Sequence, residues 1–321
     1  MRENRAFLLI LILLTGAIAA VSLVIRRTSD EEEPRHISVV FSDSSADRWA
    51  AFKAGLRQGA EDAGVDIRIV RTGRFTSLRE EEMLIENELA SGADGIILQP
   101  YEDEKLWGMV TSVNAKVPVI LTDGKEKYDI GSRQRLSFVG MDNSAAGAYL
   151  GGRILEETGA APVVGVITGD STLAGAAERV SALEEAIEAG GGTIAWVAGR
   201  SEMESDKGVP RDSAKVNVIA ALDNDGLEFA ADYAGARGDR APAVYGIGNS
   251  SKVIYSLDKG IISGILVPDE FTMGYQSVSK MADCLSSGRR GLTGAVIEPV
   301  WVTRQTIFSE ENETLLFPSV Q

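Results

Sequence analysis

From residue 37 onward the sequence alternates between two kinds of segment. Short runs rich in β-branched residues, such as Gly95–Leu98, are each followed by a longer stretch whose apolar residues recur at helical spacing. In the stretch Asp47–Ala63, for example, Phe52 and Leu56 fall on one helical face and charged residues on another. This alternation predicts an α/β fold of doubly wound parallel sheets, in which helices cover both faces of each sheet.

Most of the chain can be assigned in this way. The expected strands are Ile37–Phe41, Asp66–Val70, Gly95–Leu98, Val117–Leu121, Leu136–Gly140, Val163–Thr168, Thr193–Val197, Val216–Ala220, Ala243–Ile247, Ile262–Val267 and Val296–Val302. The expected helices are Asp47–Ala63, Ser77–Ser91, Lys105–Asn114, Asn143–Glu157, Ala174–Ala189, Leu227–Ala236, Ser250–Lys259 and Thr272–Ser287. Ligands of doubly wound sheets bind outside the carboxyl ends of the strands, so the loops there are the expected site.

Residues 6–25 near the N-terminus form a run of twenty without a charge. As a helix the run would be about 30 Å long, enough to cross one bilayer. Residues 1–27 are therefore either an uncleaved signal anchor or a signal peptide cleaved after the small residues Ala17–Ala19. Apolar character continues through Ile25, which favours the anchor, and residues 28–35 form a polar, acidic linker. We expect an extracytoplasmic protein that is anchored to the cell membrane, or is periplasmic or secreted if the segment is cleaved.

The composition excludes several classes of function. The 321 residues carry a formal charge of -15, and so acidic a chain should repel nucleic acid. The single histidine, His36, rules out most histidine-based catalysis, and the single cysteine, Cys284, cannot form an internal disulfide and is expected to be buried. The segment Gly165–Thr172 lacks the lysine of a nucleotide-binding loop. We predict no catalytic residue, no metal and no cofactor, and we expect that the protein is not an enzyme.

Five segments, in order, resemble the ribose/galactose-type periplasmic binding proteins of type I. They read ISVVFSDSSADRWAAFKAGLRQGAEDAGVDIRIV, ENELASGADGIILQP, VPVILTDG, FVGMDNSAAGAYLGG and LDKGIISGILVPDEFTMGYQSVSKM. The resemblance implies two α/β lobes joined by three hinge strands, with a ligand closed between them. The first lobe would contain residues 35–138 and 270–294, and the second residues 139–269 and 295–321.

The same resemblance implies ligand-binding residues in the first lobe. Trp49 matches an aromatic residue that stacks on the sugar ring, although its alternative role is simply to pack on the lobe. Arg48 occupies the place of a second aromatic residue, and Asp123 matches a carboxylate that ends the fourth strand, although Asp-Gly also forms turns. Gln99 lies where the family often has an amide, and Ser45 is a further candidate.

The second lobe departs from the family's pattern. The positions that align with its polar ligands are occupied by Ala177, Leu222, Gly248 and Leu266. Asp223 and Asn249 lie next to two of these positions and are kept as candidates, whereas Arg179 is as readily a surface residue. We therefore expect the first lobe to supply most of the ligand contacts.

The expected ligand is a small, neutral, sugar-like molecule. The resemblance implies delivery of this solute to an ABC-type permease that imports it. The alternative is a membrane-anchored sensory receptor that reports the ligand to a histidine kinase or similar partner. An uncleaved anchor and an incomplete second-lobe site both favour sensing, and the sequence leaves the two functions open.

Overall fold

The computed structural model describes residues 15, 34–42, 49–122, 135–159, 161–169, 175–199, 202, 215–287 and 291–317. The chain divides into residues 1–35 and residues 36–321, and the second unit holds all the elements discussed below. Of the predicted membrane span only Thr15 is described. Within the described ranges, no helix is long and apolar enough to cross a membrane.

Two six-stranded sheets organise residues 36–321. The strands are β1 (His36–Val40), β2 (Asp66–Ile69), β3 (Gly95–Leu98), β4 (Val119–Leu121), β5 (Leu136–Gly140), β6 (Val163–Thr168), β7 (Thr193–Gly199), β8 (Val218–Ala221), β9 (Ala243–Ile247), β10 (Gly264–Val267), β11 (Ala295–Val296) and β12 (Val300–Thr303). The helices are α2 (Ala50–Ala63), α3 (Leu78–Ala90), α4 (Leu106–Asn114), α5 (Asn143–Thr158), α6 (Ala176–Ala189), α8 (Asn224–Gly235), α9 (Ser251–Asp258), α10 (Glu270–Ser287) and α11 (Glu310–Leu316).

The strand order is β11-β5-β4-β3-β1-β2 in one sheet and β12-β10-β9-β8-β6-β7 in the other. Strand pairs are parallel except for β12, which runs antiparallel to β10 at the edge of the second sheet. The chain therefore passes between the sheets three times, after β5, after β10 and between β11 and β12. The prediction of two α/β lobes built on parallel sheets is confirmed.

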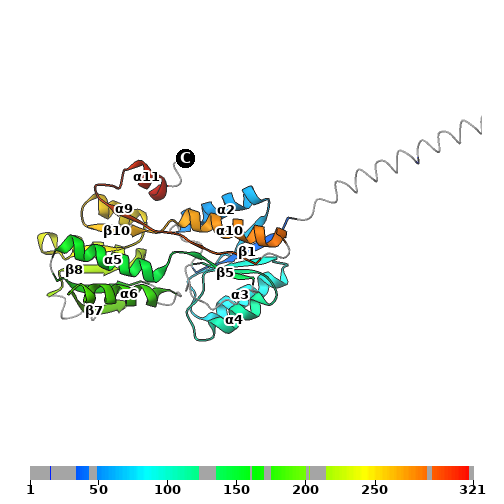
Figure 1. Ribbon diagram of the computed structural model, residues 1–321, viewed down its shortest axis with the longest axis horizontal. Coiled ribbons are helices and arrows are strands. Elements are labelled where there is room, and N and C mark those ends of the chain that lie inside the picture. The colour runs from blue at the N-terminus through cyan, green and yellow to red at the C-terminus, as the bar shows by residue number, and fades with distance from the viewer. Residues whose placement is uncertain are drawn as a thin grey trace, which may run out of the picture. The chain divides into compact units, whose positions relative to one another are not determined.

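Helices cover both faces of the first sheet (Figure 1). Alternate residues of β1 separate the two layers, because Ile37 and Val39 pack with α2 and α10, whereas Val40 packs with α3 and α4. Gly55 brings α2 and α10 into backbone contact, since a Cβ there would collide with the carbonyl oxygen of Phe271. Cys284 is buried in the same layer, as predicted.

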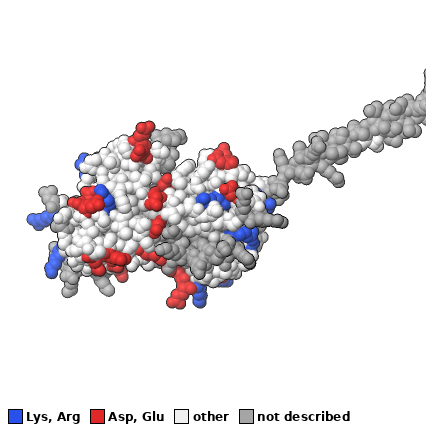
Figure 2. Space-filling view, viewed as in Figure 1, with Lys and Arg blue, Asp and Glu red and all other residues white. Residues whose placement is uncertain are grey.

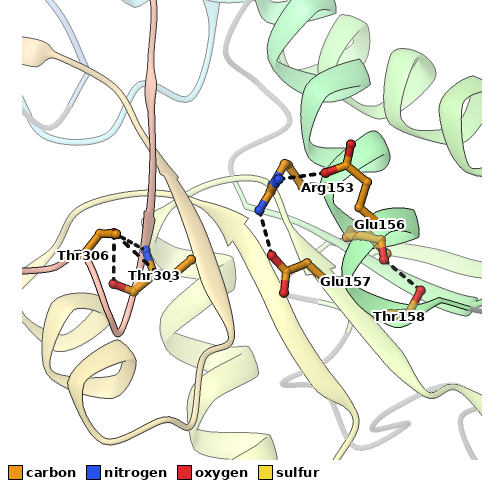
Figure 3. Close-up of polar contacts among 7 residues, drawn as sticks. Arg153, Glu156, Glu157, Thr158, Thr303 and Thr306 are labelled. Carbon is orange, nitrogen blue, oxygen red and sulfur yellow. Dashed lines mark hydrogen bonds and ion pairs between the residues drawn. The ribbon is translucent and has the colours of Figure 1, made fainter.

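The second lobe repeats this arrangement. Val166 of β6 packs with α5 and α6, and the next residue, Ile167, packs with α8 and α9. The edge strand β12 is held by Trp301, whose ring stacks on Tyr245 and lies 5.0 Å from the guanidinium of Arg153. Figure 3 shows Arg153 of α5 in contact with Glu156 and Glu157, and Thr303 in contact with Thr306 at the end of β12. Both ion pairs of Arg153 are 2.7 Å long, and Thr303 N donates a hydrogen bond to Thr306 Oγ1 at 3.0 Å.

Two expectations are corrected near the C-terminus, and one helix there had not been predicted. The single strand expected at Val296–Val302 is two strands in different sheets, because the chain crosses between lobes and Pro299 has no N–H to donate. Ala295 and Val296 pair with Val139 and Gly140 in the first sheet, although the sequence-based division placed all four residues in the second lobe. The helix α11 was not predicted, and its Leu316 joins the second lobe's core.

Candidate functional site

A cavity lies at the carboxyl ends of strands from both sheets. The space that the centre of a water molecule can occupy in it is about 90 Å³, and the total space between its walls, including the part open to solvent, is about 870 Å³. The described lining residues are Trp49, Gln99, Met141, Thr168, Gly169, Ala176, Arg179, Leu222, Asp223, Asn224, Ile247, Gly248, Asn249, Pro268, Glu270 and Met273. The cavity thus combines apolar side chains with hydrogen-bonding and charged groups.

Four of the predicted site residues lie together on this cavity. They are Trp49 and Gln99 from the first lobe and Asp223 and Asn249 from the second. Ser45, Arg48 and Asp123 lie in the ranges 43–48 and 123–134, outside the described residues.

Ser42, at the end of β1, organises the first-lobe wall of the cavity. Its backbone N–H donates to Gln99 Oε1 at 3.3 Å, and its carbonyl oxygen accepts from Trp49 Nε1 at 3.2 Å. The Trp49 ring also packs edge-on against Phe41, with ring centroids 5.1 Å apart. Trp49 is therefore a lobe-packing residue that also presents a surface to the cavity.

Asp223 follows β8 and caps α8. Its Oδ1 accepts from Gly226 N at 2.8 Å, which satisfies one of the free N–H groups of the first turn. The carboxylate lies directly against Gly169, where a Cβ would overlap it. Gly169 therefore leaves the space that Asp223 occupies at the cavity wall.

Asn224 fixes the loop that carries Asn249. Asn224 Oδ1 accepts from the backbone N–H groups of Asn249 at 2.7 Å and Ser250 at 2.8 Å, and its Nδ2 donates to Asn249 Oδ1 at 3.3 Å. A Cβ at Gly248 would lie 2.5 Å from Asn224 Oδ1, so only glycine allows this approach. The position of Asn249 at the cavity therefore depends on its hydrogen bonds with Asn224.

The sequence left Arg179 open between a site residue and a surface residue, and the structure excludes the surface position. It is only 8% exposed, lines the cavity, and its NH1 donates to the carbonyl oxygen of Leu222 at 3.0 Å. Arg179 lies three residues after Ala176, which also lines the cavity, so the two share one face of α6. The three-residue spacing from Ala176 could have indicated from the sequence that Arg179 shares its helical face.

The described residues do not bear out a site supplied mainly by the first lobe. Hydrogen-bonding side chains of the second lobe line the cavity at Thr168, Arg179, Asp223, Asn224 and Asn249. From the first lobe the described polar lining residues are Gln99 and Glu270, the latter at the start of α10. Sequence reasoning missed Glu270 because it precedes the helix expected from residue 272.

A buried carboxyl group lies behind this wall. Glu81 on α3 is fully buried, and its two carboxylate oxygens each lie 3.2 Å from Tyr101 N, two residues after Gln99. Burial raises the pKa of Glu81 from its ordinary value of 4.5 to about 8, and the bond from Tyr101 lowers it only in part.

The described residues contain no group of histidine, cysteine, aspartate and glutamate that could hold a metal ion. Acidic and basic side chains are interspersed over the face in view (Figure 2).

Two lobes of this topology with a cavity at their strand ends define a binding protein of the periplasmic type. The chain matches the periplasmic binding protein domain family over residues 37–289 and belongs to that family. The family consists of solute-binding proteins rather than enzymes.

Individual relatives are distant. The D-ribose/D-allose-binding protein of Pseudomonas aeruginosa is 23% identical over 208 residues, which are 63% of this chain and 65% of that protein, slightly less than two thirds of its length. A solute-binding protein from Burkholderia graminis, solved with D-arabinose, superposes with a TM-score of 0.75 at 18% identity, covering 87% of this chain and 99% of the other. A chain of the XylFII–LytSN complex superposes with a TM-score of 0.70 at 18% identity, covering 85% and 99%.

Proposed function

We propose that this protein is an extracytoplasmic solute-binding protein for a sugar-like small molecule, which it delivers to an ABC-type importer. The observation that carries the proposal is the cavity, because polar side chains of both lobes converge there beside the indole of Trp49. Amide, carboxylate and guanidinium groups bond hydroxyls in pairs, and an aromatic face packs on the C–H groups of a sugar ring. The fold's likeness to sugar-binding proteins supports the same ligand class.

Within this proposal, three connections between the lobes act as the hinge. Met141, Pro268 and the residues between β11 and β12 lie where the chain changes sheet, and the first two also line the cavity. Rotation about these connections would close the lobes over the ligand. Ser45, Arg48 and Asp123 remain candidates for further contacts from the first lobe.

The test is to purify the full-length protein in detergent and to measure its melting temperature with a panel that includes D-ribose, D-allose, D-arabinose and myo-inositol. A ligand present at 100 times its dissociation constant stabilises the folded state by about 2.7 kcal/mol, so a binder should raise the melting temperature clearly. X-ray scattering with the best binder should then show a smaller radius of gyration than without it. If no sugar or polyol in the panel shifts the melting temperature, the sugar-binding proposal is refuted.

A sensory receptor is the second candidate function. It is favoured by the predicted N-terminal anchor and by the similarity to a chain solved in the XylFII–LytSN complex, which shows that this fold occurs in assembly with another protein. Deleting the gene separates the two functions. Loss of uptake of the radiolabelled ligand supports import, whereas intact uptake with lost ligand-dependent transcription supports sensing.

A further inference from the structure

Among the described residues, an ion pair between Arg74 and Asp225 joins the two lobes near the cavity. Arg74 NH2 lies 2.8 Å from Asp225 Oδ2. Arg74 belongs to the segment between β2 and α3 in the first lobe, and Asp225 to the first turn of α8 in the second. Neither residue is among those that line the cavity within the described part of the chain. The pair therefore bears on how the lobes meet rather than on direct contact with a ligand.

The backbone on both sides of Arg74 is fixed to the end of β1. Thr72 Oγ1 donates to the carbonyl oxygen of Phe41 at 2.6 Å, and Phe75 N donates to Ser42 Oγ at 3.1 Å. Phe75 is also buried in the first lobe's core. Since Ser42 bonds Trp49 and Gln99, two of the first-lobe residues that line the cavity, the position of Arg74 is tied to that part of the wall.

Asp225 is equally tied to the opposite wall. It follows Asp223, which caps α8, and Asn224, which holds the loop of Asn249. The Asp225 side chain is 19% exposed and the Arg74 side chain 51%, so solvent and salt reach the pair. Because the backbone at both ends is fixed to cavity walls, opening the cavity draws the two charges apart and weakens their attraction.

We propose that the Arg74–Asp225 pair is a latch that stabilises the closed arrangement of the lobes, even when no ligand is bound. The latch rests on the proposed function only in assuming that the lobes open and close. It sets the ratio of closed to open molecules and so tunes affinity for whatever solute binds, without touching that solute. A partly exposed pair of this kind should change the ratio about two- to fivefold.

The test uses the full-length protein in detergent with no sugar added. Fluorophores at Glu86→Cys on α3 and Glu188→Cys on α6, in a Cys284→Ala background, report the distance between the lobes by single-molecule energy transfer. Arg74→Gln and Asp225→Asn should each lower the closed-to-open ratio about two- to fivefold. Arg79→Gln is the matched control, because it removes a 2.7 Å pair with Glu82 that lies within one helix, and it should leave the ratio unchanged.

Three further results are expected. The double neutral variant should lower the ratio by less than the two single effects combined, because the two charges interact with each other. The reversed pair Arg74→Asp with Asp225→Arg should restore part of the ratio. A salt concentration of about 0.5 M should lower the ratio more in the wild type than in Arg74→Gln. The latch is refuted if the single variants match the wild type, if their effects simply add, or if the sugar-free wild type shows no closed population. If the variants behave as expected but no sugar binds, only the proposed ligand is overturned. If a sugar closes the lobes and both single variants leave that closure unchanged, only the latch is overturned.

Discussion

Several residues at the carboxyl ends of the strands serve the fold and the cavity at once. Asp223 caps α8 while it lines the cavity, and Trp49 packs on Phe41 while it presents a ring to the same space. Removing such a side chain would therefore damage structure and binding together. Substitutions that keep the structural contact and change only the ligand-facing chemistry are needed to separate the two roles.

Asp223→Asn is one such change, because asparagine caps helices as well as aspartate does. We expect about tenfold weaker binding of the best sugar from the panel, since a hydrogen bond to a charged group exceeds a neutral one by roughly 1 kcal/mol or more. The melting temperature without ligand should hardly change. Asp142→Asn is the matched control, because Asp142 caps α5 through Ala145 N at 2.9 Å and is not among the described lining residues. Calorimetric titration measures the affinity of both variants and of the wild type for the sugar. If Asp223→Asn binds as tightly as the wild type, Asp223 is not part of the binding site.

Glu81 makes stability depend on pH. Its pKa is about 8 in the folded protein against an ordinary value of 4.5, so between these values the folded protein keeps a proton that the unfolded chain has lost. The free energy of unfolding should then fall as pH rises from about 4.5 to about 8, by roughly 1.4 kcal/mol per pH unit from this group.

Glu81→Gln should remove this decline while its amide oxygen still accepts from Tyr101 N. Denaturant unfolding at pH 5 and pH 8 measures the effect, and the variant should be the more stable protein at pH 8. Glu86→Gln, an exposed change on the same helix, should keep the wild-type dependence. A Glu81→Gln variant with the wild-type pH dependence would contradict the prediction.

At the scale of elements, the contact between α2 and α10 depends on the absence of a side chain. Gly55→Ala would force a Cβ into the carbonyl oxygen of Phe271, so the helices must move apart. We expect a loss of about 1–3 kcal/mol in the free energy of unfolding, measured by denaturant titration. Gly152→Ala on α5 is the control, since nothing lies within 4 Å of a Cβ there. Its better helix propensity should stabilise the protein by up to about 1 kcal/mol, and a Gly55→Ala variant as stable as this control would show that the helices adapt.

At the scale of the whole molecule, the prediction concerns where the N-terminal run places the protein. We expect residues 6–25 to be retained as a membrane anchor, because twenty apolar residues span about 30 Å as a helix. The full-length protein should fractionate with membranes and keep its original N-terminus on sequencing. A variant that lacks residues 1–27 should remain in the soluble fraction. A new N-terminus near Ala20 would instead show a cleaved signal peptide.

The sequence contained the secondary structure and much of the architecture. Each helix expected from apolar periodicity is present to within a few residues, and so are the strands apart from Val296–Val302. Local spacing is sufficient for this because burial of one face sets the period of apolar residues in helices and strands alike. The resemblance pointed to Trp49, Gln99, Asp223 and Asn249, and the structure places all four on the cavity. Their contacts with a ligand remain a prediction.

Only the tertiary structure placed the remaining parts of the site. Helical spacing relates Arg179 to Ala176, but only the packing of α6 on α5 turns their shared face to the cavity. Asn224 matters because it reaches the loop after the neighbouring strand. Arg74 and Asp225 are 151 positions apart and belong to different lobes, so no local pattern relates them. Short-range periodicity specifies which residues are buried, but which exposed side chains meet depends on the packing of complete lobes.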